Sequence, residues 1–338
     1  MIHGHGDDIG FNNHPIRLNF SSNAHHPARL NELFDHLNSC WKNACSYPEP
    51  LPETAERILA DALHVSAEEV CLTNGATEAI YLAAQAFAGR CSYILAPTFA
   101  EYADACRLHR HKVKYLYTPA RLPEDADIAW ICNPNNPTGE VIPHADMARL
   151  VQSHPHTLFL IDQSYEDFTK ERLFTTREAT ALPNVILLHS MTKRYGIPGL
   201  RVGYLTARPE LATCIRRVRM PWSVNALAME AAIFLTRHEA AFRPDTDSLL
   251  AERARVARQL EERGLAEVWP GKTHFLLARL RMGKASALKE YLAAHHGMLI
   301  RDASNFEGLD DRYFRIAIQS READDCLLNA IHEWIFEE

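Results

Sequence analysis

The 338-residue sequence lacks several features that would indicate particular classes of protein. It has no apolar run of the roughly 18 residues expected of a membrane span. Its N-terminus, MIHGHGDDIGFNN, lacks the basic-then-apolar pattern of a signal peptide. Lysine and arginine number 36 against 43 acidic residues, and the resulting net charge of -7 argues against a nucleic-acid-binding surface. We therefore expect a cytoplasmic protein that binds neither membranes nor nucleic acids.

The eight cysteines are scattered, without a CxxC pair and without the spacing of a metal site. Several lie in apolar runs such as EVCLT and AWICN, where a free thiol behaves as a small core residue. We therefore expect a reducing environment and no metal site. Arg216, Arg217 and Arg219 form a small basic cluster, which we interpret as one turn of a solvated helix.

Short apolar runs alternate with amphipathic stretches over the first two thirds of the chain, as in VCLT, SYILA, IAWIC, TLFLID and NVILLHS. Most of these runs are continuously apolar, which predicts an α/β fold whose sheet is covered on both faces. After about residue 235 the pattern changes to a long charged helix, two strands and a closing helix, typical of a smaller α+β domain. We predict an N-terminal segment (1–45) that joins the small domain, a large domain (46–235) and a small domain (236–338).

Polar and charged residues follow the ends of several predicted strands. In α/β sheets, ligands bind beyond the carboxyl ends of the strands. The residues at these positions are Asn74, Gly75, the loop that begins at Asn133, Asp162, Ser190 and Lys193. Their convergence predicts a binding site at this edge of the sheet.

Lys193 lies just beyond the apolar strand NVILLH. A desolvated lysine is costly unless it is paired or in use, and its amine can form a Schiff base with an aldehyde. Ser190 and Arg201 on either side suit a phosphate, and a helix start at Gly75–Thr77 offers free N–H groups to an anion. Taken singly, the lysine is more often structural and TNG is a turn with a helix cap. Together these residues suit a phosphorylated aldehyde.

Asp162 follows the apolar run TLFLI and needs a cationic partner, such as a protonated pyridine nitrogen. In isolation, an N-cap for the next helix is equally plausible. Tyr165 and Asn136 could donate hydrogen bonds to a ring oxygen. Phe99 could stack on a flat ring, although an aromatic residue there is more often plain packing. An aldehyde, a phosphate, a pyridinium and a ring oxygen together describe pyridoxal 5′-phosphate.

The sequence resembles the class I/II aminotransferase group of fold-type I pyridoxal-phosphate enzymes. The matching segments appear in family order from about residue 15 onward, namely YPEP, NGATE, PTFAEY, NPNNPTGE, IDQSYEDF, SMTKRYGIPGLRVGY and FRIAI. The resemblance implies a mostly parallel seven-stranded sheet between helices and a smaller α+β C-terminal domain. It also implies a homodimer whose active sites are shared between the subunits.

The resemblance also implies roles for individual residues. Lys193 would bind the cofactor covalently, and Asp162 would pair with its pyridine nitrogen. Arg315 in YFRIAIQS would bind the substrate carboxylate. The other implied cofactor contacts are Asn136 and Tyr165 to the ring oxygen, Phe99 to the ring, Gly75, Ala76, Ser190 and Arg201 to the phosphate, and Tyr47 to the phosphate of the other subunit.

The cofactor segments do not choose between transamination and decarboxylation, because the protein selects the bond to break by holding it perpendicular to the ring. The segments LIRDASNFEGLDDRYFRIAIQSREADD and HGDDIG…LNFSSNAHHP resemble threonine-phosphate decarboxylases of cobalamin synthesis. Those enzymes convert L-threonine O-3-phosphate to (R)-1-amino-2-propanol O-2-phosphate and CO2. This likeness implies that Arg301, His5 and Asn23 bind the phosphate or the carboxylate of a small phosphorylated amino acid.

Two departures and two alternatives accompany this hypothesis. The family's HGG pattern reads HGHGDD here, so His3 and His5 compete for one role, and AHHPAR replaces a NPLGPP stretch. Histidinol-phosphate aminotransferases share the core and a phosphorylated substrate, but RDASNFEGL is closer to the decarboxylases. A non-catalytic effector-binding module would carry a winged-helix domain, for which a match from about residue 15 leaves no room.

Overall fold

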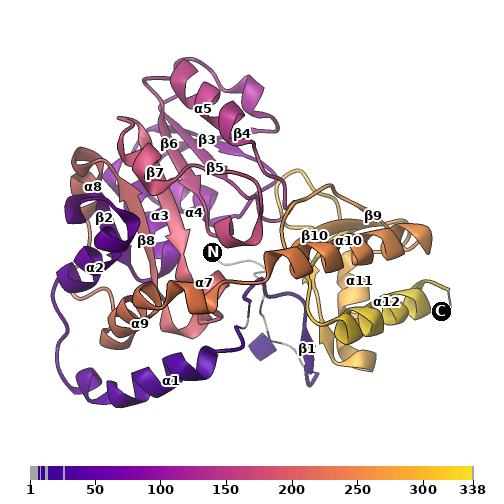
Figure 1. Cartoon of the computed structure of the whole chain (residues 1–338). Coiled ribbons are helices and arrows are strands. Elements are labelled where there is room, and N and C mark those ends of the chain that lie inside the picture. Colours follow the sequence, from indigo (N-terminus) through magenta and orange to yellow (C-terminus); the bar gives the residue numbers. More distant parts are fainter. Residues whose placement is uncertain (1–6, 8, 12–13, 26, 337–338) are drawn as a thin grey trace.

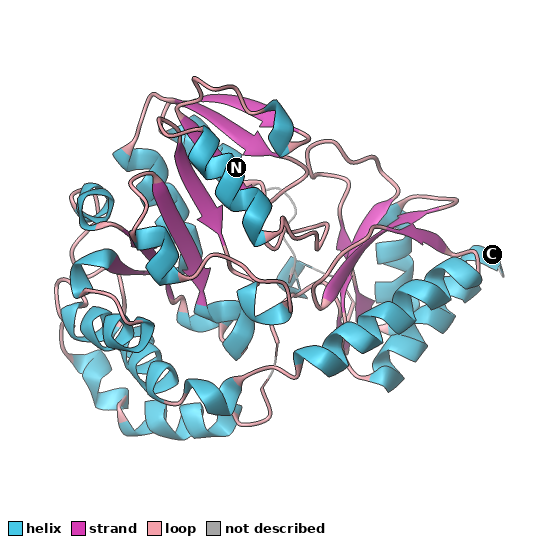
Figure 2. Ribbon diagram, turned by 45° about the horizontal axis from the view of Figure 1, so that its top comes forward, coloured by secondary structure: helices cyan, strands magenta, loops and turns pink. Residues whose placement is uncertain are grey.

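The computed structural model describes residues 7, 9–11, 14–25 and 27–336. Figure 1 shows a large sheet surrounded by helices and a smaller group of strands and helices formed by the C-terminal part of the chain. In Figure 2 the strands of these two parts form separate sheets, with loops crossing between them. No helix in the described ranges is long and apolar enough to cross a bilayer.

The large sheet has seven strands in the order β2-β8-β7-β6-β5-β3-β4. All neighbours pair in parallel except β8, which runs antiparallel to both β2 and β7. The strand bounds are β2 (Val70–Thr73), β3 (Cys91–Leu95), β4 (Lys112–Leu116), β5 (Ile128–Cys132), β6 (Leu158–Asp162), β7 (Val185–Ser190) and β8 (Gly203–Ala207). This arrangement confirms the predicted α/β class and the mostly parallel seven-stranded sheet.

Helices cover this sheet on both faces. Their bounds are α1 (Leu30–Ser39), α2 (Glu53–Leu63), α3 (Gly75–Ala86), α4 (Glu101–Leu108), α5 (His144–Ser153), α6 (Thr176–Thr180), α7 (Met191–Tyr195), α8 (Pro209–Arg216) and α9 (Ala226–Arg237). Two buried clusters line the two faces: one includes residues of α3 and α4, the other residues of α5 and α6. The continuously apolar strands are therefore explained by burial on both sides.

Strand side chains alternate between the two faces, so the last residue of each strand has a defined direction. Trp130, Leu160 and Ile186 pack in the cluster with α3 and α4, whereas Phe159 packs in the opposite one. Asp162 follows Leu160 by two positions and therefore lies on the face covered by α4. The apolar pattern of β6 thus determines where its terminal carboxylate points.

The C-terminal part contains a four-stranded antiparallel sheet in the order β12-β13-β10-β9. Its elements are β9 (Ala266–Val268), β10 (Phe275–Leu280), β12 (Arg301–Asp302), β13 (Tyr313–Ala317), α10 (Thr246–Glu262), α11 (Ala285–Tyr291) and α12 (Arg321–Phe336). This agrees with the change of pattern seen in the sequence. The domain limits at residues 45 and 235 stay predictions.

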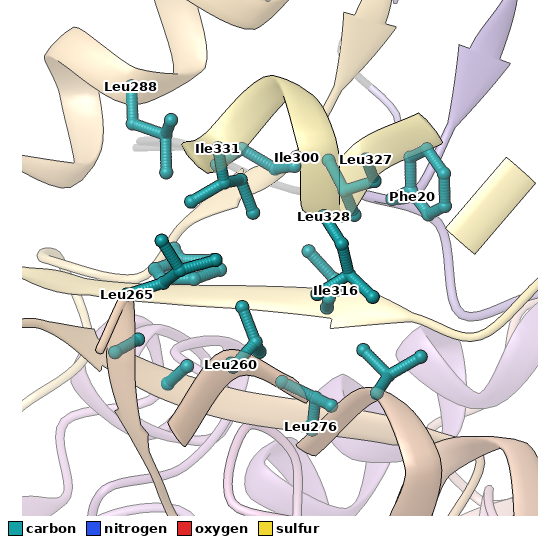
Figure 3. Packing of buried hydrophobic residues seen from close by; sticks show 14 of the residues in the cluster. Phe20, Leu260, Leu265, Leu276, Leu288, Ile300, Ile316, Leu327, Leu328 and Ile331 are labelled. Atoms are coloured by element: carbon teal, nitrogen blue, oxygen red, sulfur yellow. The ribbon is translucent and has the colours of Figure 1, made fainter. Parts of the chain in front are cut away.

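The N-terminal segment packs on this smaller part. Its strand β1 (Leu18–Asn19) pairs in parallel with β11 (Met298–Leu299). Figure 3 shows Phe20 in the same buried cluster as Leu327 and Ile316. Segments from opposite ends of the sequence therefore share one core.

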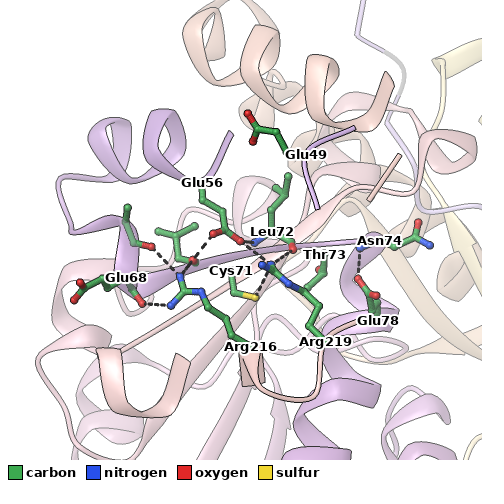
Figure 4. A network of polar contacts seen from close by, with 12 residues as sticks. Glu49, Glu56, Glu68, Cys71, Leu72, Thr73, Asn74, Glu78, Arg216 and Arg219 are labelled. Atoms are coloured by element: carbon green, nitrogen blue, oxygen red, sulfur yellow. Dashed lines mark hydrogen bonds and ion pairs between the residues drawn. The ribbon is translucent and has the colours of Figure 1, made fainter. Parts of the chain in front are cut away.

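The interpretation of the arginine cluster at the end of α8 as a solvated helical turn is wrong, because Arg216 and Arg219 bond to other segments and only Arg217 is exposed. Figure 4 shows Arg219 bonded to Glu56 and Leu72, with Nη1 2.7 Å from the Glu56 Oε1. Arg216 donates to the carbonyl oxygens of Ala67, Glu68 and Val70. The acceptors lie about 150 residues away along the chain, where local sequence patterns cannot show them.

Candidate active site

A cavity of about 360 Å³ lies at the carboxyl ends of β5, β6 and β7, next to α3, α4 and the N-terminal segment. The structure brings most of the predicted site residues to its wall. These are Asn23, Ala76, Phe99, Asn136, Asp162, Tyr165, Ser190, Lys193, Arg201 and Arg315. The convergence of strand ends that the sequence predicted is therefore confirmed.

Asp162 is buried at the end of β6 and accepts two hydrogen bonds. The Tyr102 hydroxyl donates to Oδ2 at 2.7 Å, and the Ser164 backbone N–H donates to Oδ1 at 2.8 Å. These bonds orient the carboxylate without neutralising it, so it can still pair with a cation. Sequence reasoning missed Tyr102, although it lies in PTFAEY only three residues, or about one helical turn, after Phe99.

Lys193 is half-buried in α7, which begins directly after β7. Burial lowers the pKa of Lys193 to about 8, with help from the charges of Arg315 and Arg201. The lowered pKa increases the fraction of neutral amine near physiological pH, and only the neutral amine is a nucleophile. β7 is buried up to His189, and the chain leaves the sheet at Ser190. The short α7 that follows places the Lys193 side chain on the cavity wall.

Arg201 lines one end of the cavity, and Gly75 lies against its guanidinium. Gly75 begins α3 with φ of +79°, and a Cβ atom there would lie 2.5 Å from the Arg201 Nη2. Gly203 allows an equally close approach, because its Cβ would lie 2.6 Å from the backbone nitrogen of Ala76. A guanidinium, a helix N-terminus and the hydroxyl of Ser190 thus surround a space that suits an anion.

Tyr165 and Asn23 meet on another wall, where Asn23 Nδ2 donates to the Tyr165 hydroxyl at 3.3 Å. Burial raises the pKa of Tyr165 to about 12, so the phenol keeps its proton and can donate it to a ligand. His274 Nε2 lies 2.9 Å from the Asn23 carbonyl, which can only accept, so this nitrogen carries the hydrogen. Burial lowers the pKa of His274 to about 3, and the ring is therefore neutral.

Arg315 projects from β13 into the cavity and is almost fully buried. Its Nη1 donates to Asn136 Oδ1 and its Nη2 to the Ser21 carbonyl, both at 2.5 Å. Its Nε has no hydrogen-bond partner among the described residues. Burial lowers the pKa of Arg315 to about 10. A buried cation whose hydrogen-bond acceptors are neutral favours an anionic ligand.

Arg301 lies directly opposite Arg315 in the β12–β13 pair. Its guanidinium donates to the Asp302 carbonyl and to Asn305 Oδ1, both at 2.7 Å, and lies over the Phe306 ring. Arg301 is not part of the cavity wall. The structure thus places the two predicted substrate arginines side by side, with only Arg315 in the cavity.

Two further predicted residues, Gly75 and Tyr47, do not lie on the cavity wall, and a third is not described. Gly75 lies behind Arg201 rather than on the wall. Tyr47 is 88% exposed and packs on Trp222, with ring centroids 5.7 Å apart. His5, like its competitor His3, lies outside the described residues.

The wall also contains Thr77, from the predicted helix start, and residues that sequence reasoning missed, namely Asp7, Ser21, Ser22, Tyr102 and Thr192. Asp7 lies in the HGDD segment, whose histidine was already a predicted substrate ligand, so this segment could also have indicated Asp7. Thr192 lies beside Lys193 and carried no signal of its own.

These groups fit pyridoxal phosphate, the cofactor implied by the sequence. The anion end suits its phosphate, and Asp162 can face its ring nitrogen. The close approach of Arg201 to Gly75 leaves no room for a side chain at that position. Two buried polar atoms at the cavity, Asn23 Oδ1 and Arg315 Nε, have no partner among the described residues and can serve bound molecules.

Comparisons with known proteins agree with this geometry. The family model described as aminotransferase class I and II matches residues 42–331. The chain is 32% identical over 301 residues to threonine-phosphate decarboxylase of Salmonella typhimurium, covering 84% of this chain and 82% of that protein. It is 28% identical over 305 residues to histidinol-phosphate aminotransferase of Methanocaldococcus jannaschii, covering 86% and 81%.

A crystal structure of L-threonine-O-3-phosphate decarboxylase from Porphyromonas gingivalis superposes with a TM-score of 0.92 at 36% identity. The superposition covers 95% of this chain and 100% of that one. Both the sequence match and the fold extend over the strand ends that form the cavity. The chain therefore belongs to the class I and II aminotransferase family and is a pyridoxal-phosphate-dependent enzyme.

Proposed function

We propose that the enzyme decarboxylates L-threonine O-3-phosphate to (R)-1-amino-2-propanol O-2-phosphate and CO2, a step of cobalamin synthesis. The observation that carries the proposal is the similarity to a threonine-phosphate decarboxylase of known structure over nearly the whole chain, at a TM-score of 0.92. The first curated relative, at 32% identity, has the same activity in its name. The segment RDASNFEGL, which begins at Arg301, supports the same activity.

In this proposal Lys193 holds the cofactor covalently, and Asp162 holds the proton on its ring nitrogen. When bound, pyridoxal phosphate supplies the electron sink that stabilises negative charge at the substrate's α-carbon. Asn136 and Tyr165 would donate to the ring oxygen, and Phe99 would contact the ring, since all three line the cavity. The proposed phosphate contacts are Gly75, Ala76, Ser190 and Arg201.

Decarboxylation replaces a carboxylate with a proton. Lys193, whose pKa is lowered to about 8, can carry that proton on Nζ near neutral pH. The polar residues must hold the bond between the α-carbon and the carboxylate perpendicular to the cofactor ring. We assign the carboxylate to Arg315, because its charge lies in the cavity, and the substrate phosphate to Asn23 and Arg301.

We also propose that two chains form a dimer in which Tyr47 reaches the cofactor phosphate of the other subunit. Support comes from the exposure of this side chain and of its neighbour Trp222, which is 50% exposed. Met220, at 73%, extends the apolar surface. Exposed apolar residues gathered in this way mark interaction surfaces. Light scattering on the purified protein should give twice the chain mass of 38.3 kDa.

The second candidate is a histidinol-phosphate aminotransferase, which the relative of that name at 28% identity favours. Both enzymes need the same cofactor residues and a phosphate site. They differ in the bond held perpendicular to the ring, so a product assay separates them.

The test is to incubate the purified holoenzyme with L-threonine O-3-phosphate, without a keto acid, and to follow CO2 release. Sustained release that disappears in Lys193→Ala supports the decarboxylase. No CO2, combined with glutamate formation from histidinol phosphate and 2-oxoglutarate, would assign the chain to the aminotransferases. The roles of Arg301 and Arg315 follow from comparing phosphothreonine with threonine, since loss of a phosphate ligand harms only the phosphorylated substrate.

A further inference from the structure

Three side chains with metal-binding atoms meet where α1 packs against α9, outside the active-site cavity. Figure 1 shows these two helices next to each other. His36 and Cys40 come from the end of α1, and Glu230 comes from α9. Their ligand atoms all lie within 4.8 Å of one another. His36 and Cys40 are four residues apart, which places both on one side of the helix end.

Two of the three ligand separations are close to those around a tetrahedral zinc ion, and the third pair of atoms lies within 4.8 Å. Cys40 Sγ lies 3.7 Å from His36 Nε2, and Glu230 Oε2 lies 3.5 Å from the same nitrogen. Zinc bond lengths to sulfur, nitrogen and oxygen give tetrahedral edges of about 3.4–3.6 Å between such ligand pairs. An ion can therefore be placed among the three atoms with only small movements.

The thiol and the carboxylate both approach Nε2 of His36. In a nucleophile–histidine–carboxylate relay, the two partners must use different ring nitrogens, because one nitrogen cannot serve both. The approach of both groups to a single nitrogen contradicts a relay, whereas the three donor atoms of one ion lie close to one another around that ion.

Neighbouring residues hold two of the three groups in place. Asn43 Nδ2 donates to Glu230 Oε1 at 3.0 Å, which leaves Oε2 directed toward His36. The His36 ring stacks on Phe234 with centroids 4.7 Å apart and an interplanar angle of 23°. Phe234 lies one turn after Glu230 on α9. Such outer contacts orient ligands in metal sites.

We propose that His36, Cys40 and Glu230 bind one Zn²⁺ per chain. A thiolate with an imidazole and a carboxylate suits zinc better than the hard cations calcium and magnesium. Binding forms a bond from sulfur to zinc and releases the thiol proton of Cys40. Three protein ligands leave one coordination position for water. The ion ties the end of α1, which leads to Tyr47, to α9.

The sequence could not show this site. Cys40 and Glu230 are separated by 190 positions in the sequence. A His and a Cys four residues apart occur often without a metal. The expectation of no metal site rested on local spacing alone, and the third ligand comes from a different helix.

The test uses the holoenzyme, freed of metal by a chelator and then titrated with Co²⁺ and with Zn²⁺. Co²⁺ should give thiolate charge-transfer absorption and the intense visible bands of tetrahedral coordination, and one equivalent of Zn²⁺ should abolish both. Cys40→Ala should remove the charge-transfer band. Glu230→Gln keeps the shape of the side chain and should weaken Zn²⁺ binding at least about tenfold, since even outer-contact residues contribute that much.

Cys45→Ala is the matched control, because this exposed cysteine lies five residues beyond Cys40 in the same segment. The Cys45→Ala variant should bind both metals like the wild type. Zn²⁺ should raise the melting temperatures of the wild type and of Cys45→Ala, but not that of Cys40→Ala. The proposal is wrong if the wild type gives no thiolate band, or if Cys40→Ala and Glu230→Gln bind Zn²⁺ as tightly as the Cys45 variant.

Discussion

Arg219 and Arg315 are about equally buried, at 6% and 5% exposure, but they differ in the charge of their hydrogen-bond partners. Arg219, beside β2, is 2.7 Å from a carboxylate oxygen of Glu56. Arg315, in the cavity, donates to Asn136 and to a backbone carbonyl, which are both neutral. One region thus contains a complete ion pair, and the other contains a cation whose hydrogen-bond acceptors carry no charge.

The pKa values follow this difference. Burial acts to lower the pKa of both guanidinium groups. For Arg219, Cys71 and Glu56 outweigh burial and raise the pKa above its ordinary value. For Arg315, burial prevails and the pKa falls to about 10. A buried arginine paired with a carboxylate supports the fold, whereas one with neutral partners is suited to bind an anion.

The largest effect expected is on stability, from Arg219→Met. Removing this cation leaves Glu56 buried without a counter-charge, which should lower the free energy of unfolding by about 3–5 kcal/mol. Urea unfolding measures the change. The exposed neighbour serves as control, since Arg217→Met should stay within about 0.5 kcal/mol of the wild type. An equal loss of unfolding free energy in both variants would show that the ion pair of Arg219 does not stabilise the fold.

Arg315→Met should instead damage turnover. Loss of a buried anion-binding group should lower kcat/KM roughly 10²-fold, equal to about 2.7 kcal/mol. The free energy of unfolding should stay within about 1 kcal/mol of the wild type, because the lost hydrogen bonds are offset by removal of a buried charge. Steady-state kinetics and urea unfolding on the same preparation test both statements. A strongly destabilised but fully active variant would contradict them.

The ion pair itself is tested by changing both partners. Adding Glu56→Met to Arg219→Met removes the orphaned carboxylate, so the double variant should regain at least about 1 kcal/mol over Arg219→Met alone. Urea unfolding of the wild type, the two single variants and the double variant measures the coupling between the two side chains. Strict additivity would mean that the two side chains do not interact.

The smallest effect concerns pH. The pKa of Lys193 is lowered to about 8, below its ordinary 10.5, and the neutral amine is the form that attacks the cofactor. The rate at which apoprotein develops the visible absorbance of bound cofactor should therefore rise with pH through about 8.

Arg315 is one of the charges that lower this pKa, so Arg315→Met should move the midpoint to higher pH by up to roughly one unit, or 1.4 kcal/mol. Arg219→Met should leave the midpoint in place. A shift in the opposite direction would show that Arg315 does not act on Lys193 through its charge.

The sequence placed Asp162 and Lys193 at the cavity because both lie at the carboxyl ends of buried strands. Asp162 is the last residue of β6, so the period of that strand determines its direction, whereas Lys193 lies in α7, three residues beyond the end of β7. Tyr102 was missed although its bond to Asp162 is short, because a tyrosine in a helix carries no signal until the strand beside it is known. The predictions were most successful where one strand and its terminus supplied all the information.

Arg219 shows the opposite case. Its partner Glu56 precedes it by 163 residues, and three arginines within four positions resemble a solvated surface. The fold class followed from alternating patterns that repeat along the chain. The ion pair could not be predicted, because it depends on how α2 and the segment after α8 meet in space.

The pairing of β1 with β11 also has a consequence for the order in which the protein can assemble during synthesis. Arg315 bonds to the carbonyl of Ser21, 294 positions earlier, and the backbone of Ala317 bonds to that of Phe20. On the ribosome, β1 therefore cannot pair until β11 has emerged. The substrate side of the cavity is thus among the last features to form, and truncated chains released early would lack it.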